Sequence, residues 1–200
     1  MKDWHFDREE QRRLKLKKLL KVAAACFNQK GFSATSLKDV AENLEITDAA
    51  LYYYVKNKEQ LVNLCYTHAV DLAEAALDKA IENGKDPLER LQFYIRYQIE
   101  VFFGEEGPVA ILSEIPALSA EHRELIQKRT RRHAQRVTKI IKEGVEKGVM
   151  YSSSPLAAGD AVMGALNWIP KWYSPNTKLT GQEVADSFVE TFTLGLQSRK

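Results

Sequence analysis

The sequence has little of several things, and each scarcity excludes a class of protein. Its 200 residues include two cysteines, Cys26 and Cys65, which are too few for a disulfide scaffold and lack zinc-site spacing. No uninterrupted apolar run approaches the roughly 18–20 residues that a membrane-spanning helix needs. The start of the chain is charged and contains no apolar core of a secretory signal. We therefore expect a cytoplasmic protein.

Proline and glycine are also scarce, at six and ten residues, and they fall where helices would join. No stretch alternates apolar and polar residues for long enough to predict a strand. The fold class that we expect is all-α. Apolar residues that recur every three or four positions predict helices over 8–29, 36–43, 47–55, 58–83, 87–103, 108–115, 119–147, 155–172 and 180–198.

Positive charge is concentrated near the start of the chain, although the net charge is a modest +2. Between Arg8 and Lys21 the sequence has seven basic residues and two acidic ones. Such a segment suits a polyanionic partner such as nucleic acid. Charge alone, however, favours the simpler interpretation of a solvated helix face.

Two short predicted helices joined by a tight turn follow the first long helix. Ser36 begins one of them, and Asp39 stands three residues later in the spacing of a capping box. Thr47 begins the other, where the acidic Asp48 suits the positive end of the helix dipole. This arrangement predicts a helix-turn-helix, whose second helix enters the major groove of DNA.

A longer pattern surrounds these helices. Residues 27–41 read FNQKGFSATSLKDVA and residues 47–61 read TDAALYYYVKNKEQL. In order and spacing they resemble the DNA-binding domain of the TetR family of transcriptional regulators. The departures are Glu45, where the family usually has glycine, and Val55, where it usually has phenylalanine. A residue with a side chain at position 45 is expected to need an unfavourable φ, or a slightly different turn.

The resemblance implies a division of the chain and a set of DNA contacts. It implies a helix-turn-helix domain at 1–57 and a helical ligand-binding and dimerisation domain at 58–200. The positions that match the family's phosphate contacts are Thr35, Tyr54 and Lys58. The positions that match its base or groove contacts are Thr47, Asp48, Ala49 and Tyr53, with helix capping as the alternative role for Asp48. Tyr52 is expected to pack inward.

The family resemblance also implies a homodimer that reads a palindromic double-stranded DNA operator. Its last two long helices, here 155–172 and 180–198, would form the dimer interface, and 155–172 is apolar nearly all round. The resemblance further implies a pocket for a small hydrophobic effector, whose binding releases the DNA. Candidate apolar walls are Phe93, Tyr94, Tyr97, Phe102, Ile111, Leu112 and Ile115, for which plain core packing is the alternative.

Two features point to an acyl-CoA thioester as the effector. Residues 167–173, which include Asn167 and Trp168, resemble a segment of TetR-type regulators of lipid and sterol catabolism. Arg129, Arg132 and Arg136 recur on one helix face beside His133, and guanidinium groups suit the phosphates of coenzyme A. A solvated face is the alternative for these arginines. A free lipophilic compound, as in regulators of drug efflux, is the alternative effector.

Other chemistry finds little support in the sequence. His5, His68, His122 and His133 lack the spacing of metal ligands, so neither a metal nor another cofactor is expected. No GxSxG, Walker or GxGxxG pattern is present, and no catalytic residues are assigned. We therefore expect a regulator rather than an enzyme. An all-α enzyme acting on a hydrophobic substrate, or an adaptor that has lost DNA binding, remains the alternative.

Overall fold

The computed structural model describes residues 3–105, 107, 109, 118–172 and 178–196. It divides into two compact units, one formed by 1–69 with 108–123 and the other by 70–107 with 124–200. Every regular element in the described ranges is a helix, as expected for an all-α chain. The predicted helix over 108–115 falls almost entirely outside the described residues. Among those that are described, no helix is long and apolar enough to span a membrane.

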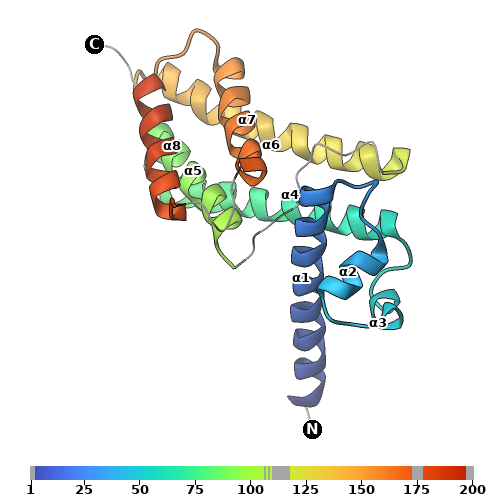
Figure 1. Ribbon diagram of the computed structural model, residues 1–200. Coiled ribbons are helices and arrows are strands. Elements are labelled where there is room, and N and C mark those ends of the chain that lie inside the picture. Colours follow the sequence, from blue (N-terminus) through green and yellow to red (C-terminus); the bar gives the residue numbers. More distant parts are fainter. Residues whose placement is uncertain (1–2, 106, 108, 110–117, 173–177, 197–200) are drawn as a thin grey trace. The chain divides into compact units, whose positions relative to one another are not determined.

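The first unit contains α1 (Asp3–Lys30), α2 (Leu37–Asn43), α3 (Asp48–Tyr52) and the beginning of α4 (Lys58–Asn83). Figure 1 shows α2 and α3 beside α1. α1 ends at Gly31, whose φ of 82° is the left-handed conformation that glycine adopts without strain. Its buried face, which includes Leu19, Leu20 and Ala23, supplies the core of this unit.

The third helix is shorter than predicted. α3 ends at Tyr52 rather than at Val55, because the amides of Tyr54 and Val55 both donate to the carbonyl of Leu51 in a closing turn. Val55 is nevertheless fully buried, so it still fills the core at the end of the helix-turn-helix. α4 then begins at Lys58, where the Asn57 carboxamide accepts a hydrogen bond from the Gln60 amide at 2.8 Å.

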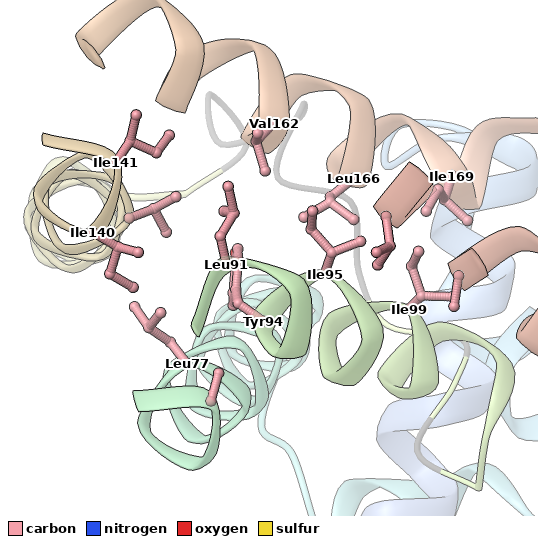
Figure 2. Close-up of a cluster of buried hydrophobic side chains, with 14 of the residues drawn as sticks. Leu77, Leu91, Tyr94, Ile95, Ile99, Ile140, Ile141, Val162, Leu166 and Ile169 are labelled. Atoms are coloured by element: carbon pink, nitrogen blue, oxygen red, sulfur yellow. The ribbon is translucent and has the colours of Figure 1, made fainter. Parts of the chain in front are cut away.

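The second unit is a helical bundle built from the rest of α4, α5 (Pro87–Phe103), α6 (Ala120–Glu146), α7 (Pro155–Trp172) and α8 (Gly181–Leu196). α5 packs along α8 and also contacts α7. Figure 2 shows the side chains of α5 pointing among those of α4, α6 and α7. The labelled core residues are Leu77, Leu91, Tyr94, Ile95, Ile99, Ile140, Ile141, Val162, Leu166 and Ile169.

Candidate nucleic-acid interface and effector region

The helix-turn-helix is held by local hydrogen bonds that its sequence predicts. The amide of Ser36 donates to the Asp39 carboxylate at 2.7 Å, and the amide of Asp39 donates to the Ser36 hydroxyl at 3.1 Å, which completes the capping box. The Ser36 hydroxyl also donates to Asp39, and Lys30 lies 3.1 Å from the same carboxylate. The hydrogen bonds from Ser36, with that from Lys30, lower the pKa of Asp39 well below its ordinary value.

The turn between α2 and α3 contains one strained residue. Glu45 has a φ of 57°, the left-handed region that residues with a side chain adopt at a cost. Its amide donates to the carbonyl of Glu42, and the amide of Ile46 donates to Ala41, so the turn is tight and internally bonded. The expected unfavourable φ at this position is confirmed.

The first turn of α3 is exposed, as a recognition helix requires. Thr47 caps the helix by accepting a hydrogen bond from the Ala50 amide at 3.2 Å. Asp48 and Ala49 are exposed, and Tyr53 keeps 72% of its surface exposed at the far end of the helix. Tyr52 is also 56% exposed, so the expectation that it packs inward is wrong. The early end of α3 leaves Leu51 and Val55 as the buried residues of this segment.

Lys58, at the start of α4, is held beside the recognition helix by two contacts. Its ammonium lies 4.0 Å from the centre of the Phe32 ring and donates to the carbonyl of Ser33 at 3.4 Å. It lines a hollow of about 440 Å³ together with residues of the α2 and α3 N-termini. The residues with polar side-chain groups that line the hollow are Ser33, Thr35, Ser36, Lys38, Asp48, Tyr52 and Lys58. Hydroxyls and ammonium groups are suitable donors to phosphate.

Thr35 does not belong to this exposed set of donors. Its side chain is 1% exposed, and its hydroxyl lies 2.8 Å from the carbonyl of Gly31 and 3.2 Å from that of Cys26. Those carbonyls are at the end of α1, so the hydroxyl stabilises the chain as it leaves the helix. The phosphate contact expected of the Thr35 side chain is therefore corrected to a structural role.

One polar cluster of the first unit was not predicted as functional. The Glu59 carboxylate accepts a hydrogen bond from the Ser119 amide at 2.8 Å and lies 3.4 Å from Nδ1 of His122. The Ser119 amide is the main cause of the lowered pKa of Glu59. The cluster ties the beginning of α4 to the beginning of α6. One feature of the sequence could have indicated this cluster. His122 lies three residues after Ser119, at the capping-box position where a carboxylate is usual.

The second unit buries a row of polar groups inside its apolar core. The Tyr94 hydroxyl lies 2.9 Å from Nε2 of His133 and 3.1 Å from the Met163 sulfur. Burial, together with the nearby Arg136 charge, lowers the pKa of His133 to about 4, so the ring is neutral at neutral pH. Burial also raises the pKa of Tyr94. The predicted effector residues Tyr94 and His133 thus come together.

Two atoms of this region are buried without a hydrogen-bond partner among the described residues: Nδ1 of His133 and Oε1 of Gln98. Gln98 is one helical turn beyond Tyr94 on α5 and is 5% exposed. A buried polar atom without a partner costs stability, on the order of 1–3 kcal/mol. Each such atom in a native core calls for an explanation, and a water molecule or a bound ligand could supply the missing hydrogen bond.

The other predicted aromatic walls lie around the same core. Phe93 and Tyr97 stack at 5.8 Å between ring centres, and both, with Phe102, pack against the buried cluster as partly exposed residues. Tyr97 also accepts a hydrogen bond from Asn83 at 3.1 Å. Ile111, Leu112 and Ile115 lie outside the described residues.

Two of the three arginines of the predicted face, Arg129 and Arg136, are paired with carboxylates. Arg129 donates to Asp71 at 2.7 Å and also to Glu74, while Arg136 donates to Asp78. All three carboxylates lie on α4, so the arginines brace α6 against α4. The charge of Arg129 is balanced by two carboxylates, so its predicted contact with the phosphates of coenzyme A stays a prediction that requires those carboxylates to move. Sequence periodicity on α6 could not reveal partners on another helix.

The predicted effector residues Asn167 and Trp168 lie on α7, away from its buried stripe. The buried stripe of α7 is Gly159, Val162, Leu166 and Ile169, which leaves Asn167 and Trp168 on the exposed side. Trp168 is 62% exposed and shares that side with Leu156 and Trp172. Both predicted residues are exposed rather than part of the core of the unit, and their effector contacts stay a prediction.

These features define a helix-turn-helix DNA-binding regulator with a separate helical domain. A family model described as the tetracyclin repressor-like C-terminal domain matches residues 84–196. A second, described as bacterial regulatory proteins of the tetR family, matches residues 19–65. The first match alone covers more than half of the chain. The chain therefore belongs to the TetR family of DNA-binding transcriptional regulators.

Individual relatives are similar to this protein in sequence or structure over most of its length. The HTH-type transcriptional repressor KstR2 of Mycobacterium tuberculosis is 25% identical over 174 residues, which cover 86% of this chain and 87% of the relative. The crystal structure of PfmR from Thermus thermophilus has a TM-score of 0.76 and 32% identity, covering 88% of this chain and 97% of PfmR. AibR in complex with isovaleryl coenzyme A and operator DNA has a TM-score of 0.74 and 26% identity, covering 89% and 98%.

Proposed function

We propose that this protein is a repressor that binds a palindromic operator as a homodimer and is released by a hydrophobic effector. The observation that carries the proposal is the exposed N-terminal turn of α3 beside Lys58. Ala49 and Thr47 stand where side chains reach base edges in the major groove, and Ala49 offers a methyl group to thymine. Asp48 either accepts a hydrogen bond from the amino group of cytosine or only stabilises the N-terminus of α3 through the helix dipole.

The phosphate contacts follow from the same geometry. Lys58 and Tyr54 flank α3, and Tyr53 is the most exposed aromatic residue at its end. An ammonium and phenolic hydroxyls at helix ends position a protein on DNA without reading sequence. Because α3 carries no arginine, asparagine or glutamine, groove shape is expected to contribute to operator choice.

The proposed dimer interface is the exposed side of α7 together with α8. Leu156, Trp168 and Trp172 expose large apolar surface, and the small residues Ala161 and Gly164 between them permit close approach of another helix. Several large exposed apolar residues on one side of a helix suit a protein interface. A two-fold dimer also matches half-sites one helical turn apart, ~34 Å.

For the effector we propose an acyl-CoA thioester, with a free lipophilic compound as the alternative. The buried row of Tyr94, His133 and Gln98 would meet the polar end of an acyl chain whose apolar part lies among the aromatic side chains around it. AibR, which has been crystallised with isovaleryl coenzyme A, supports the thioester class. Arg129 is already paired with Asp71 and Glu74. The coenzyme A phosphates would therefore bind to other residues, or they would displace these two carboxylates from Arg129.

Release of the operator requires that the effector binds two conformations of the protein with different affinities. The effector must bind more tightly to a conformation in which the two DNA-binding heads fit the operator poorly, and its effect is limited to that difference. A coupling of about 1.4 kcal/mol changes operator affinity tenfold.

Native mass spectrometry tests the dimer and the effector together. We expect a dimer that binds long-chain acyl-CoA more tightly than the matching free fatty acid. Trp168→Glu should give a monomer, whereas Lys142→Glu, at an exposed lysine of α6 outside the proposed interface, should not. A dimer that binds neither compound would reject the thioester and direct the search to aromatic and drug-like effectors.

A further inference from the structure

A second concave surface of the first unit lies away from the hollow that contains Lys58. It is a groove of about 500 Å³ lined by the N-terminal half of α1 and by the residues that follow α3. α1 contributes Arg8, Arg12 and Lys15, and the α3 end contributes Tyr53 and Tyr54. The two tyrosine rings meet edge to face, with centres 5.2 Å apart, so one ring orients the other.

The register of α1 explains why these cations line the groove. Arg8, Arg12 and Lys15 recur at four and three residues, which places them on one face of the helix. That face continues into Leu19 and Ala23, which are buried in the core of the unit. The same stripe therefore changes from apolar to basic toward the N-terminal part of α1. Figure 1 shows this part of α1 extending past α2 and α3. Arg8 lies eleven residues before Leu19, which corresponds to about 16 Å of helix.

The charge of the groove favours an anion. Its lining has three cations and one carboxylate, Glu9, so its formal charge is positive. Arg13, the remaining arginine of this helical segment, is absent from the lining and pairs with Glu10 at 2.6 Å. Guanidinium groups donate in pairs to phosphate oxygens, and a phenolic hydroxyl can donate to the same group.

We propose that this groove is a DNA-backbone site that holds the phosphodiester strand next to the bases read by α3. DNA is the occupant because Tyr53 and Tyr54 join the groove to the end of the recognition helix, so a strand that lies against α3 continues into it. The inference rests on the proposed function and adds to it: α1 contributes sequence-independent affinity from outside the helix-turn-helix.

The test compares two arginines of α1 that line the groove, Arg8 and Arg12, with one that does not, Arg13. Binding of the full-length protein to a labelled random-sequence duplex of about 30 base pairs is followed by fluorescence anisotropy between about 50 and 200 mM NaCl. The double variant Arg8→Ala/Arg12→Ala should lose roughly tenfold in affinity for each arginine. Its slope of log affinity against log salt should fall by roughly two units, at about 0.9 per phosphate contact.

Arg13→Ala is the matched control, because it removes the same charge from the same helix outside the groove. It should change affinity by less than about threefold, since a screened charge acts weakly at a distance. Alanine favours helix at all three positions, and circular dichroism checks that α1 is retained.

Equal losses in the double variant and the control would overturn the groove as a DNA site, as would an unchanged salt slope. In either case the proposed function stands if Lys58→Ala still weakens binding. Failure of the unaltered protein to bind any duplex at low salt would instead reject the proposed function itself.

Discussion

The ammonium of Lys58 lies 4.0 Å above the ring of Phe32, which comes directly after the glycine that ends α1. The contact joins the start of α4 to the loop before α2. It holds a flexible lysine near one position, so part of the entropy cost of ordering this side chain on DNA is already met. Two residues of the family motif thus contact one another within the protein.

Replacing Lys58 with alanine is expected to weaken binding to every duplex by a similar factor, because phosphate contacts carry no sequence information. The slope of log affinity against log salt should fall by about 0.9. Anisotropy titrations on two unrelated duplexes measure both effects. Lys142→Ala, at an exposed lysine of α6 in the second unit, is the control and should leave the slope unchanged. A loss confined to one duplex would contradict the phosphate role.

Glu45→Gly is expected to stabilise the protein, because glycine adopts the φ of 57° without the strain that a side chain causes. The gain should be up to about 1 kcal/mol, since the flexibility of glycine in the unfolded chain offsets part of the relief. Urea unfolding measures it through the transition midpoint. Glu45→Ala should show no such gain, because alanine keeps the strain. Equal stabilisation by both variants would show that side-chain charge, and not backbone conformation, is responsible.

His133 predicts a loss of stability on acidification. Its pKa of about 4 in the folded protein is below the ordinary value of 6.5, chiefly because burial disfavours the charged ring. The unfolded chain therefore binds the proton first. Stability should be intact above pH 6.5, decline as the pH falls toward 4, and lose about 3 kcal/mol in total.

The neighbouring charges act in both directions: Glu74 and Asp78 favour protonation of His133, and Arg136 opposes it. Urea unfolding at several pH values, with His133→Gln as the comparison, isolates the contribution. Glutamine can still bond to Tyr94 but does not titrate. Identical pH profiles of the two proteins would mean that His133 is not held neutral by burial.

Gln98→Met should affect stability and effector binding in opposite directions. Oε1 of Gln98 is buried without a partner among the described residues, so a methionine of similar size removes an unsatisfied acceptor. We expect the effector-free protein to gain about 1 kcal/mol in its free energy of unfolding. Effector affinity should fall about tenfold if a ligand group donates to Oε1. Gains in both quantities would remove Gln98 from the effector site.

Local features of this fold could be predicted from the sequence because their causes are local. The Ser36–Asp39 capping box, the Thr47 cap and the glycine end of α1 each depend on residues within four positions of one another. The strain at Glu45 was expected from the family resemblance, because the family usually has glycine at this position. Helix limits followed from apolar periodicity with two main departures: α1 begins at Asp3 rather than near Arg8, and α3 stops at Tyr52, where a turn replaces the last helical residues.

Features that depend on contacts between distant segments could not be predicted. Arg129 was expected to face a ligand, yet its carboxylate partners lie more than fifty positions earlier on α4. The burial of Thr35 depends on the carbonyl of Cys26, and the exposure of Trp168 depends on which stripe of α7 meets α5. Tyr94 and His133 were both chosen as candidates, but their hydrogen bond could not be seen from positions 39 residues apart.

The central claim is that this chain reads DNA as a two-fold dimer, and selection of bound duplexes from a random-sequence pool tests it most directly. The account predicts enrichment of an inverted repeat whose half-site centres lie about one helical turn, or a small multiple of it, apart. Substitutions at Thr47 and Ala49 should change the enriched bases, while Lys58→Ala should lower recovery without changing them. No enrichment over the input pool, or an enriched single site without two-fold symmetry, would contradict the account.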